Sequence, residues 1–284
     1  MIPGSFEYHR PDSVNAAVKL LAEHGDEARV MAGGHSLVPL MKMRMTDIDH
    51  LIDLQAIDDL KGISINGDKI RIGALTTQHE LINDKGLAKA APIIHEASLQ
   101  IADPQVRYMG TIGGNVANGD PGNDMPGLMQ CLDATYEVEG PNGKREVKAR
   151  DFYEAAYFTA LGEDEILTAV EFDAPKGGYA YEKMKRKIGD YATAAAAVLI
   201  EMDGGKCTSA SIAMTNLSDT PIYSEAAGKA LIGSSLDEDA IGAAVKAMDE
   251  AINPAEDNRG PVDFKRHVAG VMLRRAIARA AERA

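Results

Sequence analysis

The sequence predicts an α+β protein in two parts. Helix patterns alternate with strand and hairpin patterns up to a linker of sequence DAPKGG at residues 173–178, and beyond it three strand patterns are followed by three helix patterns. We therefore expect an N-terminal region of residues 1–176 and a C-terminal domain of residues 177–284. A chain of 284 residues with 45% hydrophobic content is long enough for both parts to bury a core.

The N-terminal region begins with a predicted helix at residues 11–25. Asp12 or Ser13 can cap its first turn, apolar residues recur at helical spacing, and Gly25 ends the pattern. Alternating isoleucines around Asn66-Gly67 are typical of a hairpin. The other elements that we expect are strands at 28–32, 50–54 and 165–172, hairpins at 62–75 and 135–149, mostly helical structure at 77–102, and a helix at 123–134.

The C-terminal domain is predicted to place strands before helices. A turn at residues 203–205, Asp-Gly-Gly, joins the second and third strands. The expected strands are 179–187, 192–202 and 206–216, and the expected helices are 224–232, 237–252 and 263–283.

Charge and composition exclude several functions. A net charge of -13 argues against a nucleic-acid partner, because phosphate backbones are bound by clustered lysine and arginine. No apolar run resembles a membrane span or a signal peptide, so we expect a cytoplasmic protein that reaches the inner face of a membrane only through partners. Cys131 and Cys207 are too few for an iron-sulfur cluster, and the seven histidines show no ligand spacing, so no metal site is predicted.

Two Gly-Gly pairs stand out as candidate binding elements. The first, in VMAGGHSLVPL at residues 30–40, ends a predicted strand, and the second lies in MGTIGGNVANG at residues 109–119. Adjacent glycines let successive backbone N–H groups point into one concavity, which is a common way to bind phosphate. Each pair is flanked by hydroxyl or amide side chains. One such segment alone is usually a simple turn, but two together favour a pair of loops that hold a pyrophosphate from opposite sides.

Other nucleotide-binding and catalytic motifs are absent from the sequence. It contains no GxGxxG that opens a helix after a strand, no GxxxxGK[ST], no GxSxG and no HExxH. No pair of carboxylates and no nucleophile with a base is evident, so no catalytic residue is predicted.

The two glycine motifs resemble a known family. AGGHS at 32–36 and TIGGN at 111–115 are similar to the paired pyrophosphate-binding motifs in the FAD-containing subunits of molybdenum hydroxylases, the xanthine dehydrogenase family. The resemblance covers the whole chain. GDPGNDMPGLM at 119–129 and KRKIGDYATAAAAV at 185–198 also match, and AYFTA at 156–160 is most similar to the aerobic carbon monoxide dehydrogenase branch.

The resemblance implies a fold and a set of cofactor contacts. The fold has an N-terminal FAD-binding region of two α/β subdomains of the vanillyl-alcohol-oxidase type, here about 1–58 and 59–176. Its C-terminal domain has a three-stranded antiparallel sheet with a helical bundle. FAD is expected to be bound non-covalently. The implied FAD-binding residues are Ala32, Gly33, Gly34, His35, Ser36, Ile101, Ala102, Thr111, Gly113, Gly114, Asn115, Asp124, Leu167, Lys183, Asp190 and Tyr191.

The resemblance also implies an electron-transfer function. In the family, a large subunit oxidises substrate at a molybdenum cofactor and a small subunit carries two-iron two-sulfur clusters. The FAD subunit passes electrons to an external acceptor such as a quinone or a cytochrome, and the assembly is a dimer of heterotrimers. Three alternatives stay open: a related subunit serving an enzyme for nicotinate, aromatic acyl groups or purines, a stand-alone FAD-dependent oxidase, and a scaffold that has lost the cofactor.

Overall fold

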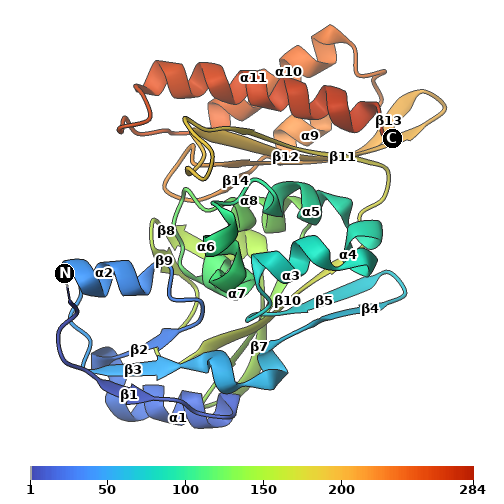
Figure 1. Ribbon diagram of the computed structural model, residues 1–284. Helices are drawn as coiled ribbons and strands as arrows, with labels where there is room; N and C mark the ends of the chain where they lie inside the picture. Colours follow the sequence, from blue (N-terminus) through green and yellow to red (C-terminus); the bar gives the residue numbers. More distant parts are fainter. Residues whose placement is uncertain (1) are drawn as a thin grey trace.

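A small parallel sheet forms the N-terminal unit of the molecule. The computed structural model describes residues 2–284, and in it the strand order of this sheet is β1-β3-β2, with both pairings parallel. Figure 1 shows α1 lying along this sheet at one end of the molecule. The elements of this unit are β1 (Glu7–His9), α1 (Val14–His24), η1 (Gly25–Glu27), β2 (Ala28–Met31), α2 (Leu37–Met43), β3 (His50–Asp53), η2 (Leu54–Ala56) and η3 (Asp58–Leu60).

Helix α1 confirms the prediction from its caps and its apolar face. The Ser13 side chain accepts a hydrogen bond from the backbone N–H of Ala16, and Gly25 ends the helix with a φ of 52°. Ala17 and Leu21 are buried in a core cluster that also contains Ile52 of β3. The helix therefore fixes which face of the parallel sheet is covered.

The second sheet is antiparallel and has five strands in the order β4-β5-β10-β6-β7. Both predicted hairpins are confirmed, and β10 lies between them, paired to β5 and β6. A core cluster joins this sheet to five of the six short helices in this part of the chain; the helix at residues 104–109 contributes no residue to it. The elements are β4 (Ile63–Asn66), β5 (Lys69–Gly73), α3 (Gln78–Asn83), α4 (Lys85–Ala90), α5 (Pro92–Ser98), α6 (Pro104–Met109), α7 (Ile112–Ala117), α8 (Asp124–Cys131), β6 (Thr135–Gly140), β7 (Gly143–Lys148), η4 (Ala149–Asp151), β8 (Tyr153–Ala155), β9 (Phe158–Thr159) and β10 (Ile166–Asp173).

The third sheet has helices on both faces. Its order is β11-β12-β13-β14, and Figure 1 shows α10 and α11 across one face, with α5 and α8 toward the other. The alanines of β12 alternate between two core clusters, so their small side chains let helices approach from both sides. The elements are β11 (Gly178–Met184), β12 (Ala194–Asp203), β13 (Lys206–Thr215), β14 (Ile222–Tyr223), α9 (Glu225–Leu231), α10 (Glu238–Ala251) and α11 (Val262–Ala281).

Several elements differ from the sequence-based predictions. The region 77–102 forms three short helices, because Asp84 caps α4 and Pro92 starts α5. The segment 111–115 was expected to be a loop, but it forms the first turn of α7, with Thr111 as its N-cap. The C-terminal sheet gains β14 as a fourth, two-residue strand, and α2, α6 and β1 were not predicted.

No helix of residues 2–284 is long and apolar enough to cross a membrane.

Candidate functional site

A cavity of about 810 Å³ lies where the three sheets and the short helices meet. This volume falls within the usual range for cofactor pockets, about 300–1,000 Å³. Its lining runs from Arg29 in β2 to Tyr191, which follows β11, so it includes segments on both sides of the predicted linker. All of the residues implied by the family resemblance line this one cavity: Ala32, Gly33, Gly34, His35, Ser36, Ile101, Ala102, Thr111, Gly113, Gly114, Asn115, Asp124, Leu167, Lys183, Asp190 and Tyr191.

The first glycine motif is a turn with free backbone donors. Among residues 2–284, the N–H groups of Gly33, Gly34, His35 and Ser36 donate to no protein acceptor. Gly34 has a φ of +72°, a left-handed conformation that glycine adopts without strain. The Gln55 side chain donates to the Ala32 carbonyl at 3.3 Å, and this contact anchors the turn to η2. The turn thus offers successive N–H groups to an anion in the cavity.

The second glycine motif uses its backbone donors internally. The N–H of Gly113 donates to the Ala74 carbonyl at 2.8 Å, and that of Gly114 donates to Thr111 Oγ1 at 3.0 Å. The backbone N–H of Asn115 donates to the carbonyl of Thr111. The expectation that both glycine pairs lie in loops is therefore wrong for the second motif, which forms a helical turn whose amides are bonded within the protein. Thr111 and Asn115 are also among the residues that line the cavity.

The glycines also allow the two motifs to pack together closely. A Cβ on Gly33 would lie 2.0 Å from the carbonyl oxygen of Met109, the last residue of α6. A Cβ on Gly113 would lie 2.5 Å from the Ala74 side chain. At Gly114 the nearest atom would be Thr111 Oγ1, and its φ is not positive, so its conformation demands no glycine. Gly33 and Gly113 are therefore required for the close approach of one segment to another.

A buried ion pair closes one wall of the cavity. Lys183 Nζ lies 2.8 Å from Asp124 Oδ2, and the two side chains are 1% and 6% exposed. The Tyr181 hydroxyl donates to the other carboxylate oxygen of Asp124 at 2.5 Å. Burial, followed by the charge of Asp124, raises the pKa of Tyr181 well above its ordinary value, so the phenol keeps its proton. A buried carboxylate with both oxygens bonded has a fixed position in the wall.

Asn115 connects this wall to the second glycine motif. Its side-chain oxygen accepts a hydrogen bond from the Met125 backbone N–H, and its carbonyl accepts one from the Asn123 side chain. These bonds tie the end of α7 to the start of α8, where Asp124 is the first residue. The position of Asp124 therefore depends on the same asparagine that the glycine motif supplies.

The connection between β11 and β12 forms part of the cavity rim. Tyr191 is 42% exposed, and its ring packs where a Cβ on Gly122 would come within 2.9 Å. Burial, and then the negative charge of Asp120, raises the pKa of Tyr191 to about 12. Arg186 Nε donates to Asp190 at 3.0 Å, which holds the connection in a compact turn. Tyr191 is therefore a neutral aromatic side chain at the mouth of the cavity.

A residue distant in sequence supports this rim. The guanidinium of Arg259 lies 5.5 Å from the centre of the Tyr191 ring and 4.0 Å from Asp190. Arg259 Nε is buried and has no hydrogen-bond partner among residues 2–284. Sequence reasoning missed this residue, because nothing in the pattern around position 259 indicates a contact with position 191.

Ile101 and Ala102 form a further part of the lining. Ala102 has a φ of 43°, a left-handed conformation that is uncommon for alanine. Arg107 supports it from α6, since its Nη1 donates to the Ile101 carbonyl at 2.9 Å. Gly189 of the rim packs against this segment, because a Cβ added there would lie 3.5 Å from the Ala102 carbonyl carbon.

The lining includes residues that the sequence analysis did not select. Tyr157 and Glu165 belong to the hairpin region and to the segment before β10, and Gln78 opens α3. Tyr181 is not part of the lining, but it bonds to Asp124; it lies two residues before Lys183 in the same strand, so period-two alternation was a signal that could have identified it. The two cysteines, Cys131 and Cys207, are outside the lining; both are free and buried, and burial raises the pKa of the Cys131 thiol to about 12.

Two family models together match almost the whole chain. Residues 4–175 match the FAD binding domain in molybdopterin dehydrogenase, and residues 179–280 match the CO dehydrogenase flavoprotein C-terminal domain. The chain therefore belongs to the family of FAD-binding medium subunits of molybdenum hydroxylases.

The chain is highly similar to medium chains of carbon monoxide dehydrogenases. It is 58% identical to that of Afipia carboxidovorans, over 100% of this chain and 99% of the relative. It is 44% identical to that of Hydrogenophaga pseudoflava, over 98% and 97%. A solved structure of reconstituted CO dehydrogenase from Oligotropha carboxidovorans superposes with a TM-score of 0.99, at 59% identity and full coverage of both chains.

Proposed function

We propose that this chain is the FAD-binding electron-transfer subunit of an acceptor-dependent carbon monoxide dehydrogenase. The observation that carries the proposal is the cavity itself: every residue implied by the family motifs lines it, and one of its turns offers free backbone amides. Full-length identity to carbon monoxide dehydrogenase medium chains supports the choice of branch.

The pyrophosphate of FAD is assigned to the first glycine motif. The N–H groups of Gly33, Gly34, His35 and Ser36 have no other partner among the described residues, and a pyrophosphate supplies the acceptors that they lack. This local arrangement lets a chain with a net charge of -13 hold an anion without clustered basic residues. Thr111 and Asn115 of the second motif line the same cavity, and their hydroxyl and amide groups can each donate a hydrogen bond to the cofactor.

The chain's own contribution to the chemistry is binding and positioning. When bound, FAD supplies the redox chemistry, accepting electrons and passing them on. The Asp124–Lys183 pair and Tyr181 give the wall a fixed, fully bonded polar arrangement, and Tyr191 offers an aromatic surface at the mouth.

Partners follow from the proposed function. We assign the molybdenum cofactor to a large subunit and the two-iron two-sulfur clusters to a small one, in a dimer of heterotrimers that reduces a quinone or a cytochrome. We place the assembly in the cytoplasm, with contact to the inner face of the membrane through partners.

Within the chain, we propose a domain boundary between residues 176 and 177, next to the start of β11 at Gly178.

Copurification tests the proposal. The chain, expressed with its native neighbouring genes, should purify with a molybdenum subunit and an iron-sulfur subunit, contain one FAD per chain, and support reduction of a quinone or dye by carbon monoxide. Activity only with nicotinate, an aromatic aldehyde or a purine would move the chain to another branch of the family. A solitary yellow protein that oxidises a substrate by itself would overturn the electron-transfer assignment.

A further inference from the structure

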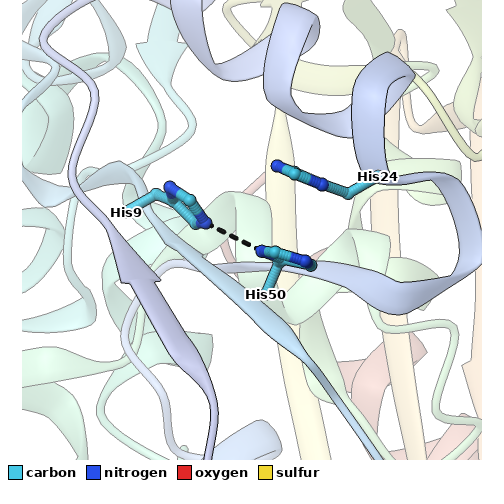
Figure 2. Close-up of side chains that lie close together, drawn as sticks. All are labelled: His9, His24 and His50. Carbon is cyan, nitrogen blue, oxygen red and sulfur yellow. Dashed lines mark hydrogen bonds between the residues drawn. The ribbon is translucent and has the colours of Figure 1, made fainter.

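Three histidines meet on the N-terminal unit, outside the FAD cavity. His9 ends β1, His24 ends α1 and His50 begins β3 (Figure 2). One ring nitrogen from each lies within 4.8 Å of the others, and all three residues are half-buried. None of them lines the cavity. The sequence predicted no metal site, because these positions are far apart along the chain.

The fold explains why the three side chains gather. In the parallel pairing of β1 with β3, Glu7 is opposite His50 and His9 is opposite Ile52. Side chains two residues apart lie on one face of a sheet, so His9 and His50 share the face that carries Ile52. That face is covered by α1, which Gly25 ends directly after His24. The end of α1 therefore places the His24 imidazole beside those of His9 and His50.

The ring nitrogens and a nearby carboxylate are close enough to share one ion. His9 Nε2 and His50 Nδ1 are 3.0 Å apart in a hydrogen bond, which needs a lone pair on one of these two nitrogens. The rings of His24 and His50 stack with centroids 3.6 Å apart and an angle of 10° between their planes. Glu7 adds a carboxylate oxygen 3.7 Å from His50 Nδ1. Three imidazoles and a carboxylate are a common ligand set for zinc.

We propose that His9, His24 and His50 form a binding site for Zn²⁺, with Glu7 or a water molecule as the fourth ligand. Tetrahedral zinc with bonds of about 2.0–2.1 Å separates its nitrogen ligands by about 3.3 Å. The His9–His50 nitrogens therefore need to move apart by only a few tenths of an ångström. Imidazole lone pairs lie in the ring plane, so His24 must tilt out of its stack, which its broad second side-chain torsion permits.

The surroundings favour a cation at this position. The site lies at the C-terminal end of α1, a helix of 11 residues, where the backbone carbonyls carry partial negative charge. A bound ion would link β1, a three-residue edge strand, and α1 to β3. The site is thus structural: it stabilises the N-terminal unit, and it takes no part in electron transfer.

Zinc binding by the untagged, full-length chain tests the proposal. After treatment with EDTA and dialysis, titration calorimetry with ZnCl₂ and metal analysis should give one tightly bound Zn²⁺ per chain. X-ray absorption should show imidazole nitrogens at about 2.0–2.1 Å. His24→Gln, at the end of a helix, should weaken the Kd at least tenfold, whereas His267→Gln, on the exposed face of α11, should leave it unchanged.

A second measurement separates zinc binding from folding and from FAD. Zn²⁺ should raise the Tm of the wild-type chain but not that of His24→Gln or His50→Gln, and FAD content should be the same with and without zinc. Absence of stoichiometric binding, or equal zinc affinity in wild type and His24→Gln, would overturn the assignment. Neither result would bear on the proposed FAD site, because the three histidines lie outside the cavity.

Discussion

Replacing Gly33 by alanine should both destabilise the chain and weaken FAD binding. The added Cβ would lie 2.0 Å from the Met109 carbonyl oxygen and 2.7 Å from its carbonyl carbon, whereas real Cβ atoms essentially never approach closer than 3.0 Å. To make room, either the glycine turn or the end of α6 must move by about 1 Å. Both segments meet through backbone atoms in a closely packed region, so neither can move freely. Such overpacking typically lowers the free energy of unfolding by about 1–3 kcal/mol. Because the neighbouring atoms are backbone and move little, we expect a loss near the upper end of that range.

The same displacement should show in FAD affinity. A shift of about 1 Å takes an amide out of hydrogen-bond distance of a bound phosphate. Loss of one charge-assisted bond costs about 1.5–3 kcal/mol, which is about a 10- to 150-fold increase in Kd. The assay is titration of the deflavinated chain with FAD, followed by flavin fluorescence, together with urea unfolding of the flavin-free chain.

Gly242→Ala is the matched control. Gly242 lies inside α10, where a Cβ would meet only the Arg274 side chain at 3.9 Å. Alanine there should stabilise the chain by about 0.5–1 kcal/mol and leave FAD affinity unchanged. If Gly33→Ala matched wild type in both assays, the close packing of the first glycine motif against α6 would be refuted.

Three further predictions follow from buried or paired groups. Asp124→Ala leaves Lys183 buried without its partner, so urea unfolding should show a loss of about 3–5 kcal/mol; a loss below about 1 kcal/mol would contradict the burial of this pair. Cys131, whose pKa burial raises to about 12, should not react with Ellman's reagent at pH 8 until the chain is unfolded, and rapid reaction in the folded chain would refute this. The hydrogen bond from Arg145 lowers the pKa of Glu165, so this pair stabilises the fold above the unfolded carboxyl pKa of about 4.3 and loses that contribution as the pH falls through the folded value. Urea unfolding of wild type and Arg145→Gln should therefore differ by a constant amount above about pH 6 and converge toward pH 3, and a pH-independent difference would argue against the pair.

Local sequence signals predicted much of the fold because they act over a few residues. The Asn66-Gly67 turn and its alternating isoleucines specify a hairpin, and Ser13 and Gly25 bracket a helix. The break of region 77–102 into three helices is also local, in Asp84 and Pro92, although the overall pattern predicts mostly helical structure without placing each break. Residues of β1 and β14 carry no such signal, since each is a very short strand held by its neighbour in the sheet.

The candidate site could be predicted where the residues concerned lie together in one short motif. The glycine turn at residues 33–36 carries its own donors, so its composition alone suggested anion binding. The second motif has a similar sequence but a different physical role, because its backbone N–H groups donate hydrogen bonds to Ala74 and Thr111. That difference depends on which segments pack beside α7, and it is not visible in the motif.

Long-range contacts were the part that no pattern could supply. Arg259 reaches Tyr191 from a distant part of the sequence, and the three histidines come together only because β1, α1 and β3 meet at one end of a sheet. The Asp124–Lys183 pair joins a helix to a strand beyond the linker. Such contacts are set by tertiary packing, so local propensity cannot supply them; the family resemblance named Asp124 and Lys183, but neither Arg259 nor the three histidines.

The central claim is that the first glycine motif holds the FAD pyrophosphate through its backbone amides. A structure of this chain with FAD bound tests it most directly. We expect phosphate oxygens at about 2.7–3.2 Å from backbone nitrogens within residues 33–36, with the amides of Gly113 and Gly114 still bonded to Ala74 and Thr111. A pyrophosphate seated on α7, with the amides of residues 33–36 facing water, would contradict it.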